Sequence, residues 1–132
     1  MSGKTNLSEL LSEMNPQLHE GDYVFVSVSD SFSINLHDVL ASFREQEGVT
    51  LVLEKQKADQ LSLKYDYVAS WITLNVHSSL EAVGLTAAVS KVLAENEISC
   101  NVVAAYYHDH IFVDKQNGKK AIDVLKQLSK MN

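Results

Sequence analysis

The sequence predicts an α+β fold, and the clearest part of it is a strand–helix–strand–strand unit between Trp71 and Val113. A strand-like run over residues 71–77 passes through a polar turn into a helical pattern. The run over 98–113 then has the pattern of a β-hairpin. This order is most of a ferredoxin-like βαββαβ unit, in which helices cover one face of a sheet.

The first predicted element is a helix that begins near Asn6. Asn6 is a residue type that caps helices, and Glu9 follows it three positions later. Apolar residues then recur at the spacing of one helical face, at Leu7, Leu10, Leu11 and Met14. We therefore expect a helix with a single apolar stripe.

The rest of the first half also reads as strand, helix and strand. Residues 23–28 alternate with valines on one face, which predicts a strand. A helical stripe of Leu36, Val39, Leu40 and Phe43 runs on to Gly48, which is expected to stop the helix. Residues 49–53 form the next predicted strand, and a helical turn over 57–61 follows. Because the second half repeats this order, a degenerate duplication is possible, with the boundary near 66–70.

In the second half, the strand over 71–77 has one apolar and one largely polar face. The helix that follows is expected to bury three apolar residues, Leu85, Val89 and Val92. The run 102–105 is apolar on both faces, as in a central strand, and the last helix has its stripe at Ala121, Val124, Leu125 and Leu128. A complete ferredoxin-like unit needs one more strand. We expect the first half, through 23–28, or a second subunit to fill that edge.

Composition excludes several functional classes. With 132 residues, 45% of them hydrophobic, the chain is long enough for one compact domain or two fused halves. Its net charge of -6 is wrong in sign for binding nucleic acid. A single cysteine, Cys100, allows no intramolecular disulfide, and neither a signal peptide nor a membrane span is evident. These features favour a cytoplasmic protein.

The residues that first suggest chemistry have simpler explanations. His108-Asp109-His110 contains metal-ligand residue types, but it falls at the expected tip of a hairpin, and a structural metal needs about four ligands. Cys100 has the setting of a small buried hydrophobe. No nucleophile, base and oxyanion set is recognisable, so we expect no catalytic residue, no metal and no cofactor.

The turn before the middle helix is more informative. Ser78 followed by Glu81 has the form of a capping box. The same helix start would also offer unpaired N–H groups to a carboxylate. Gly84 would be costly inside a helix, which indicates close approach by a ligand or by a neighbouring segment.

Three strings of the second half together resemble an ACT domain, a small ferredoxin-like regulatory module. They are Ile72-Thr-Leu-Asn-Val76, Leu80-Glu-Ala-Val-Gly-Leu85 and Ile98-Ser-Cys-Asn-Val102. More closely, the region resembles short, stand-alone bacterial tandem-ACT proteins of unassigned function. The resemblance implies two fused ACT-like halves: residues 1–69 as a degenerate half and 70–132 as an ACT domain.

In the ACT family, the strand-to-helix loop and the start of the next strand line the effector site. The resemblance therefore implies a site formed by His77, Ser78, Val83, Gly84, Asn101 and Val102. Helix amides would hold an amino acid's carboxylate, and Asn101 would accept from its ammonium group. Val83 stands where many ACT domains have proline. The expected function is amino-acid-responsive regulation by a cytoplasmic homo-oligomer, and the alternative is a self-association module that binds no ligand.

Overall fold

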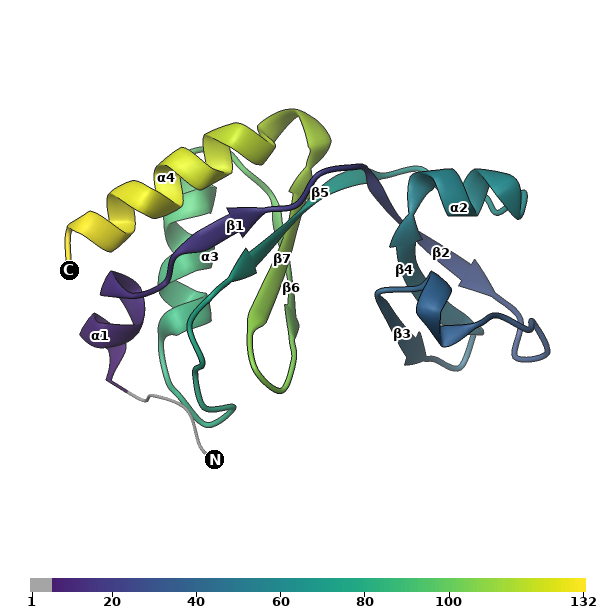
Figure 1. The fold of residues 1–132 in the computed structure, drawn as a ribbon, viewed down its shortest axis with the longest axis horizontal. Helices are drawn as coiled ribbons and strands as arrows, with labels where there is room; N and C mark the ends of the chain where they lie inside the picture. Colours follow the sequence, from purple (N-terminus) through teal and green to yellow (C-terminus); the bar gives the residue numbers. More distant parts are fainter. Residues whose placement is uncertain (1–5) are drawn as a thin grey trace. The chain divides into compact units, whose positions relative to one another are not determined.

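The protein, seen in a computed structural model that describes residues 6–132, forms two compact units (Figure 1). The large unit combines the described residues up to Glu20 with Ser70–Asn132. The small unit comprises Gly21–Ala69. Both are mixtures of helices and strands, so the predicted α+β class is confirmed.

The large unit contains the complete strand–helix–strand–strand–helix order that the sequence predicts. Its elements are α1 (Leu7–Ser12), β1 (Pro16–Leu18), β5 (Val68–Leu74), α3 (Leu85–Glu95), β6 (Cys100–Ala104), β7 (Asp109–Asp114) and α4 (Gly118–Lys130). The side chain of Asn6 accepts a hydrogen bond from the amide of Glu9 at 3.0 Å, which confirms the cap of the first helix.

The strand order in the large unit is β1-β5-β7-β6, so the N-terminal strand β1 fills the edge that the second half leaves vacant. Residues 23–28 do form a strand, but this strand meets β5 at Val68 and Ala69 and otherwise pairs with β4. The first half therefore supplies the missing strand, though from a shorter segment than expected. Strand β1 runs antiparallel to β5, in the register Pro16↔Leu74, Gln17↔Thr73 and Leu18↔Ile72.

Strand β6 corrects a second expectation. The run 102–105 was expected to be central, but β6 lies at the edge of the sheet and pairs with β7 alone among the described strands. Val102 is 39% exposed as a result. The apolar residues on both faces of this segment therefore do not mark a central strand.

The core of the large unit lies between one face of its sheet and helices α1, α3 and α4. Alternate residues of β5 and β7 point toward these helices because side chains alternate across a strand. The central core residues are Leu10, Leu11, Met14, Ile72, Leu74, Leu85, Val89, Leu93, Ile111, Val113, Ala121 and Leu125.

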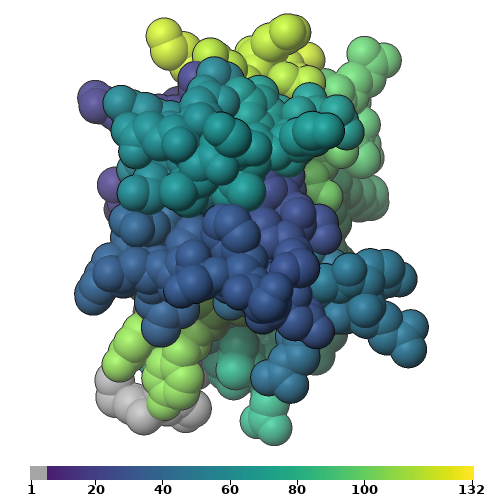
Figure 2. Space-filling model, turned by 90° about the vertical axis from the view of Figure 1, so that its right-hand side faces the viewer, coloured from purple at the N-terminus to yellow at the C-terminus, as the bar shows by residue number. Residues whose placement is uncertain are grey.

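The small unit is built on β2 (Tyr23–Val28), β3 (Ala41–Arg44), β4 (Val49–Glu54) and α2 (Lys55–Gln60). Its strands have the order β3-β4-β2, with the first two residues of β5 beside β2. The buried core contains Val24, Val26, Leu51, Leu53 and Ala58. In Figure 2 this unit faces the viewer, with the teal segment around α2 above the blue segment of β2 and β3.

The predicted helix over residues 36–43 is wrong. The segment begins with a single 3₁₀ turn at Leu36–Asp38 and continues as β3, so Leu36 and Phe43 are 77% and 71% exposed. The physical reason is that the backbone groups of this segment pair with β4, with Phe43 opposite Thr50. Gly48 belongs to the hairpin turn: a Cβ there would lie 2.5 Å from the carbonyl oxygen of Val28.

Candidate functional site

The loop between β5 and α3 is anchored to the start of β7. Ser78 is buried, and its hydroxyl donates a hydrogen bond to Asp109 at 3.3 Å. Ser78 is therefore not a helix cap, and the predicted capping box with Glu81 is wrong. Instead the amide of Glu81 donates to the hydroxyl of Ser79 within a turn, and α3 begins only at Leu85.

Gly84 is the N-cap residue immediately before α3, rather than a residue inside the helix. Its φ of +104° belongs to a region that side-chain-bearing residues rarely adopt. A Cβ at this position would lie 3.1 Å from Cδ2 of Leu7. The close neighbour that the glycine accommodates is thus a side chain of α1.

The N-terminus of α3 has no side-chain cap. The helix spans Leu85–Glu95, and its first regular backbone bond runs from the amide of Ala88 to the carbonyl of Gly84. The first-turn amides of Leu85, Thr86 and Ala87 therefore have no capping side chain, in contrast to α1. These amides and the positive end of the helix dipole are suited to binding a carboxylate.

The tip of the β6–β7 hairpin lies beside this loop. Tyr106 and Tyr107 are each 63% exposed, and their rings meet edge to face with centroids 4.9 Å apart. The ring of His77 lies 5.5 Å from that of Tyr107, which joins the loop to the tip. Val83 is 84% exposed and Leu80 68% exposed in the same loop. The helix start thus adjoins an exposed apolar and aromatic surface.

The three residues of His108-Asp109-His110 do not act together. The turn closes with a bond from the amide of Ala105 to the carbonyl of His108, so the two tyrosines, and not this cluster, occupy the tip. The ring of His108 lies 3.4 Å from the carbonyl of Val76, Asp109 accepts from Ser78, and His110 points to the other sheet face. Among residues 6–132, no group of three or more His, Cys, Asp or Glu residues is placed to hold a metal ion.

The structure brings His77, Ser78, Val83 and Gly84 together in the loop but places Asn101 and Val102 elsewhere. Asn101 lies opposite Phe112 and Val102 opposite Ile111, so their side chains point to opposite faces of the edge strand. Asn101 is three residues from the hairpin end of β6, which corresponds to about 10 Å at 3.3–3.4 Å per residue. Within one chain, these two positions do not line the loop.

A polar cluster on the other face of the large unit's sheet was missed by sequence reasoning. We call His19, Trp71, Thr73 and His110 the histidine cluster. The ring of His19 stacks on that of Trp71, with centroids 3.6 Å apart and an interplanar angle of 15°. The hydroxyl of Thr73 lies 2.7 Å from Nε2 of His19 and 2.9 Å from Nδ1 of His110. These contacts join β7 to β5, and β5 to the residue that follows β1.

The indole of Trp71 fixes the protonation of the histidine cluster. Its N–H can only donate, and it donates to Nδ1 of His110 at 3.1 Å. Nδ1 therefore carries no proton, so the hydroxyl of Thr73 donates to it as well and accepts from Nε2–H of His19. Burial lowers the pKa of His110, and the His108 and His19 rings add to this effect while Asp109 opposes it. Burial also lowers the pKa of His19. The lowered pKa values favour the neutral form of both imidazoles.

One part of the histidine cluster was accessible from the sequence. Trp71 and Thr73 are two residues apart in β5, so their side chains lie on the same face of the strand. The addition of His19 depends on the pairing of β1 with β5 across a long stretch of chain. No local signal in the sequence identifies it.

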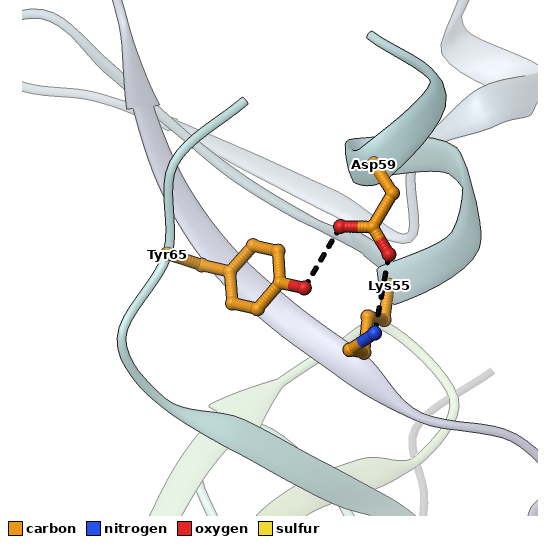
Figure 3. A network of polar contacts seen from close by, with 3 residues as sticks. All are labelled: Lys55, Asp59 and Tyr65. Atoms are coloured by element: carbon orange, nitrogen blue, oxygen red, sulfur yellow. Dashed lines mark hydrogen bonds and ion pairs between the residues drawn. The ribbon is translucent and has the colours of Figure 1, made fainter. Parts of the chain in front are cut away.

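The small unit carries a separate polar network beside a cavity (Figure 3). Asp59 accepts hydrogen bonds from Tyr65 at 2.8 Å and from Lys55 at 3.1 Å. The bonds from Tyr65 and then Lys55 lower the pKa of Asp59. The adjoining cavity has a volume of about 370 Å³ and is lined by Gly21, Asp22, Glu54, Lys55, Gln56 and Asp59. Its lining carries more acidic than basic groups.

Cys100 packs against the core of the large unit, as its setting in the sequence indicates. Burial raises the pKa of its thiol, which keeps the sulfur protonated. In the part of the chain that the structure describes, no helix is long and apolar enough to cross a membrane.

The large unit combines a ferredoxin-like arrangement of strands and helices with a surface loop before the start of α3. Models of the ACT domain match residues 2–70 and 67–127 of this chain. The chain belongs to the ACT domain family, with two ACT domains in tandem, and this confirms the resemblance seen in the sequence. ACT domains are regulatory rather than catalytic modules.

Among solved structures, the chain is similar to a Vibrio cholerae protein of unknown function, described as a possible transport protein. The two are 49% identical with a TM-score of 0.80, over 93% of this chain and 95% of the other. An Agrobacterium tumefaciens protein is 19% identical, covers 86% of this chain and 87% of its own, and has a TM-score of 0.66. Escherichia coli aspartokinase III, solved with aspartate and ADP, is 12% identical over 86% of this chain and 32% of its own, with a TM-score of 0.60. No curated protein matches this sequence.

Proposed function

We propose that this chain is a cytoplasmic regulatory protein that binds an amino acid at the start of α3. The observation that carries the proposal is the uncapped N-terminus of α3, which directly follows the loop that holds effectors in the ACT family. The first-turn amides bind the carboxylate of the effector. The aspartokinase III neighbour, solved with aspartate, supports an amino acid as the ligand class.

The complete site is formed by two copies of the chain. One copy contributes His77, Ser78, Val83 and Gly84, and the other contributes the edge strand with Asn101 and Val102. Strand β6 has an open edge, and edge strands are templates for pairing with another chain. The side-chain carbonyl of Asn101, which is exposed, accepts from the ammonium group of the ligand. Covering the exposed Val83 adds apolar contact.

The ligand regulates the docking of subunits or of a partner protein. No residue has a catalytic role in this proposal, and neither metal nor cofactor takes part. The net charge of -6 makes nucleic acid an unsuitable partner.

A melting screen with the twenty amino acids at millimolar concentration tests the proposal. A cognate ligand at 100 times its Kd stabilises the native state by about 2.7 kcal/mol. Thr86→Asp places a competing carboxylate in the first turn, so it should abolish the ligand shift while stabilising the free protein by about 0.3–1 kcal/mol. Lys91→Gln makes the same charge change further along α3 and should keep the shift. The absence of any shift, or an undiminished shift in Thr86→Asp, contradicts the proposal.

A second candidate function is self-association without a ligand, which the open edge of β6 favours. The bond from Ala105 to His108 sets the alternation in β6, so the N–H and C=O groups of Val102 point away from β7. Val102→Pro removes the outward N–H and should shift sedimentation toward monomers, whereas Val102→Thr keeps the N–H group and the association. Ligand-independent assembly in the wild type favours this second function.

A further inference from the structure

The outer edge of β1 borders a groove that is separate from the loop between β5 and α3, which we call the effector loop. The groove has a volume of about 370 Å³ and lies between β1 and α4, which run side by side in Figure 1. Its lining consists of Pro16, Leu18, Lys119, Ile122, Asp123 and Lys126. We call it the β1–α4 groove. It lies wholly within the large unit.

The backbone of β1 offers hydrogen-bonding groups to this groove. The amide of His19 donates to the carbonyl of Trp71, so the backbone groups of Gln17 and His19 point toward β5. Those of Leu18 point the other way, as does the carbonyl of Pro16. Proline has no N–H, so the free edge offers one donor and two acceptors. Such an edge can receive a short extended segment but not a long strand.

One face of α4 forms the other wall of the β1–α4 groove. Lys119, Ile122, Asp123 and Lys126 follow the spacing i, i+3, i+4 and i+7, so they share a helix face. Ile122 packs against the core and continues the apolar floor formed by Pro16 and Leu18. The ion pairs found among residues 6–132 do not include either lysine of this face. The wall therefore presents two ammonium groups above an apolar floor.

The charge of α4 is opposite to that of the chain as a whole. Five of the 11 basic residues lie between Lys115 and Lys130, where Asp123 is the only acidic residue, so this segment carries +4. Since the net charge is -6, the remainder carries -10. A partner with carboxylates is attracted to this face. A two-fold arrangement that pairs β1 with β1 of a second copy would place both lysine faces together, which is unfavourable.

We propose that the β1–α4 groove binds an acidic, extended segment of a partner protein. The backbone of the segment adds to the free edge at Leu18, and an apolar side chain contacts the floor formed by Pro16 and Ile122. Its flanking carboxylates pair with Lys119 and Lys126. This surface is separate from the effector loop, so partner binding does not require that the proposed amino-acid site exists.

Fluorescence anisotropy with a labelled heptapeptide in which glutamate alternates with valine tests this inference. The full-length protein should bind the peptide at 50 mM NaCl, and binding should weaken as salt rises. The Lys119→Glu/Lys126→Glu variant should weaken binding at least tenfold. The control Lys64→Glu/Lys91→Glu makes the same change in net charge outside the groove and should stay within twofold of the wild type.

Asp123→Asn removes the one carboxylate that lines the groove and should tighten binding, which provides a gain that a folding defect cannot imitate. No binding of the labelled peptide with wild-type protein titrated to about 1 mM overturns the inference. Equal loss in the control variant overturns it too, because it shows unspecific attraction. If sedimentation instead shows self-association that only the groove variant abolishes, the occupant is a second copy and the proposed partner is wrong.

Discussion

Replacing Thr73 by valine tests the histidine cluster as a source of stability. Thr73 is 4% exposed, and its hydroxyl bridges two imidazoles, 2.7 Å from His19 and 2.9 Å from His110. Valine has nearly the same shape and the same β-branching, so the strand and the packing are retained. The change replaces the hydroxyl by a methyl group.

The expected loss follows from the hydrogen bonds that disappear. Two bonds at a net value of about 0.5–1.5 kcal/mol each give about 1–3 kcal/mol. His110 keeps the indole N–H as its partner, whereas Nε2–H of His19 loses the acceptor that lies 2.7 Å away. The added methyl group of valine offsets about 0.8 kcal/mol. We therefore expect the free energy of unfolding to fall by about 0.2–2.2 kcal/mol.

Urea unfolding monitored by tryptophan fluorescence measures this effect, because Trp71 is the one tryptophan of the chain and stacks on His19. Circular dichroism provides a second probe of the same transition. Thr86→Val makes the same chemical change at an exposed position and should alter stability by less than about 0.5 kcal/mol. If Thr73→Val is as stable as the wild type, the bridging hydroxyl contributes nothing and the reasoning is refuted.

Three further perturbations test other contacts. The pKa of His110 is lowered in the folded state, so the unfolded chain binds more protons between that lowered pKa and about 6.5. The free energy of unfolding should therefore fall as the pH drops through this window. Urea titrations at several pH values should show a flatter pH dependence in the His110→Asn variant. Gly118→Ala would place a Cβ 2.7 Å from Oγ of Ser70. This overpacking should destabilise the protein by about 1–3 kcal/mol, of which the better helix propensity of alanine offsets about 1 kcal/mol. The double variant that also carries Ser70→Ala should recover the lost stability. Gly84→Ala should lower the melting temperature through a strain of about 1–3 kcal/mol at φ +104° and its contact with Leu7, and an unchanged melting temperature would show that the loop relaxes freely.

The elements that were predicted correctly are those with local causes. The cap at Asn6 and the apolar stripe of α4 each lie within a few turns of the chain. Strand 23–28 is marked by its own alternation. Such features depend on residues that are close in the sequence, and the periodicity of the sequence reveals them.

The errors arise where a long-range partner decides the structure. Ser78 has the sequence context of a helix cap, but its hydroxyl donates to Asp109, and α3 starts later, at Leu85. The segment 36–43 has helical spacing, but β4 takes its backbone groups. Strand β1 is only three residues long and includes a proline, so its pattern is too short to predict a strand. The histidine cluster depends on the pairing of that strand with β5, so the sequence pattern did not predict the cluster either.

The N-terminal segment links these features to the proposed effector loop. Leu10 and Met14 of this segment are fully buried in the core of the large unit, and Leu7 rests against Gly84 at the start of α3. On its other side the loop is held by the bond from Ser78 to Asp109. An effector bound as proposed on the first turn of α3 would therefore contact a loop that is held between α1 and β7. A shift of Gly84 toward α1 would press on Leu7, so α1 is positioned to link the loop to β1.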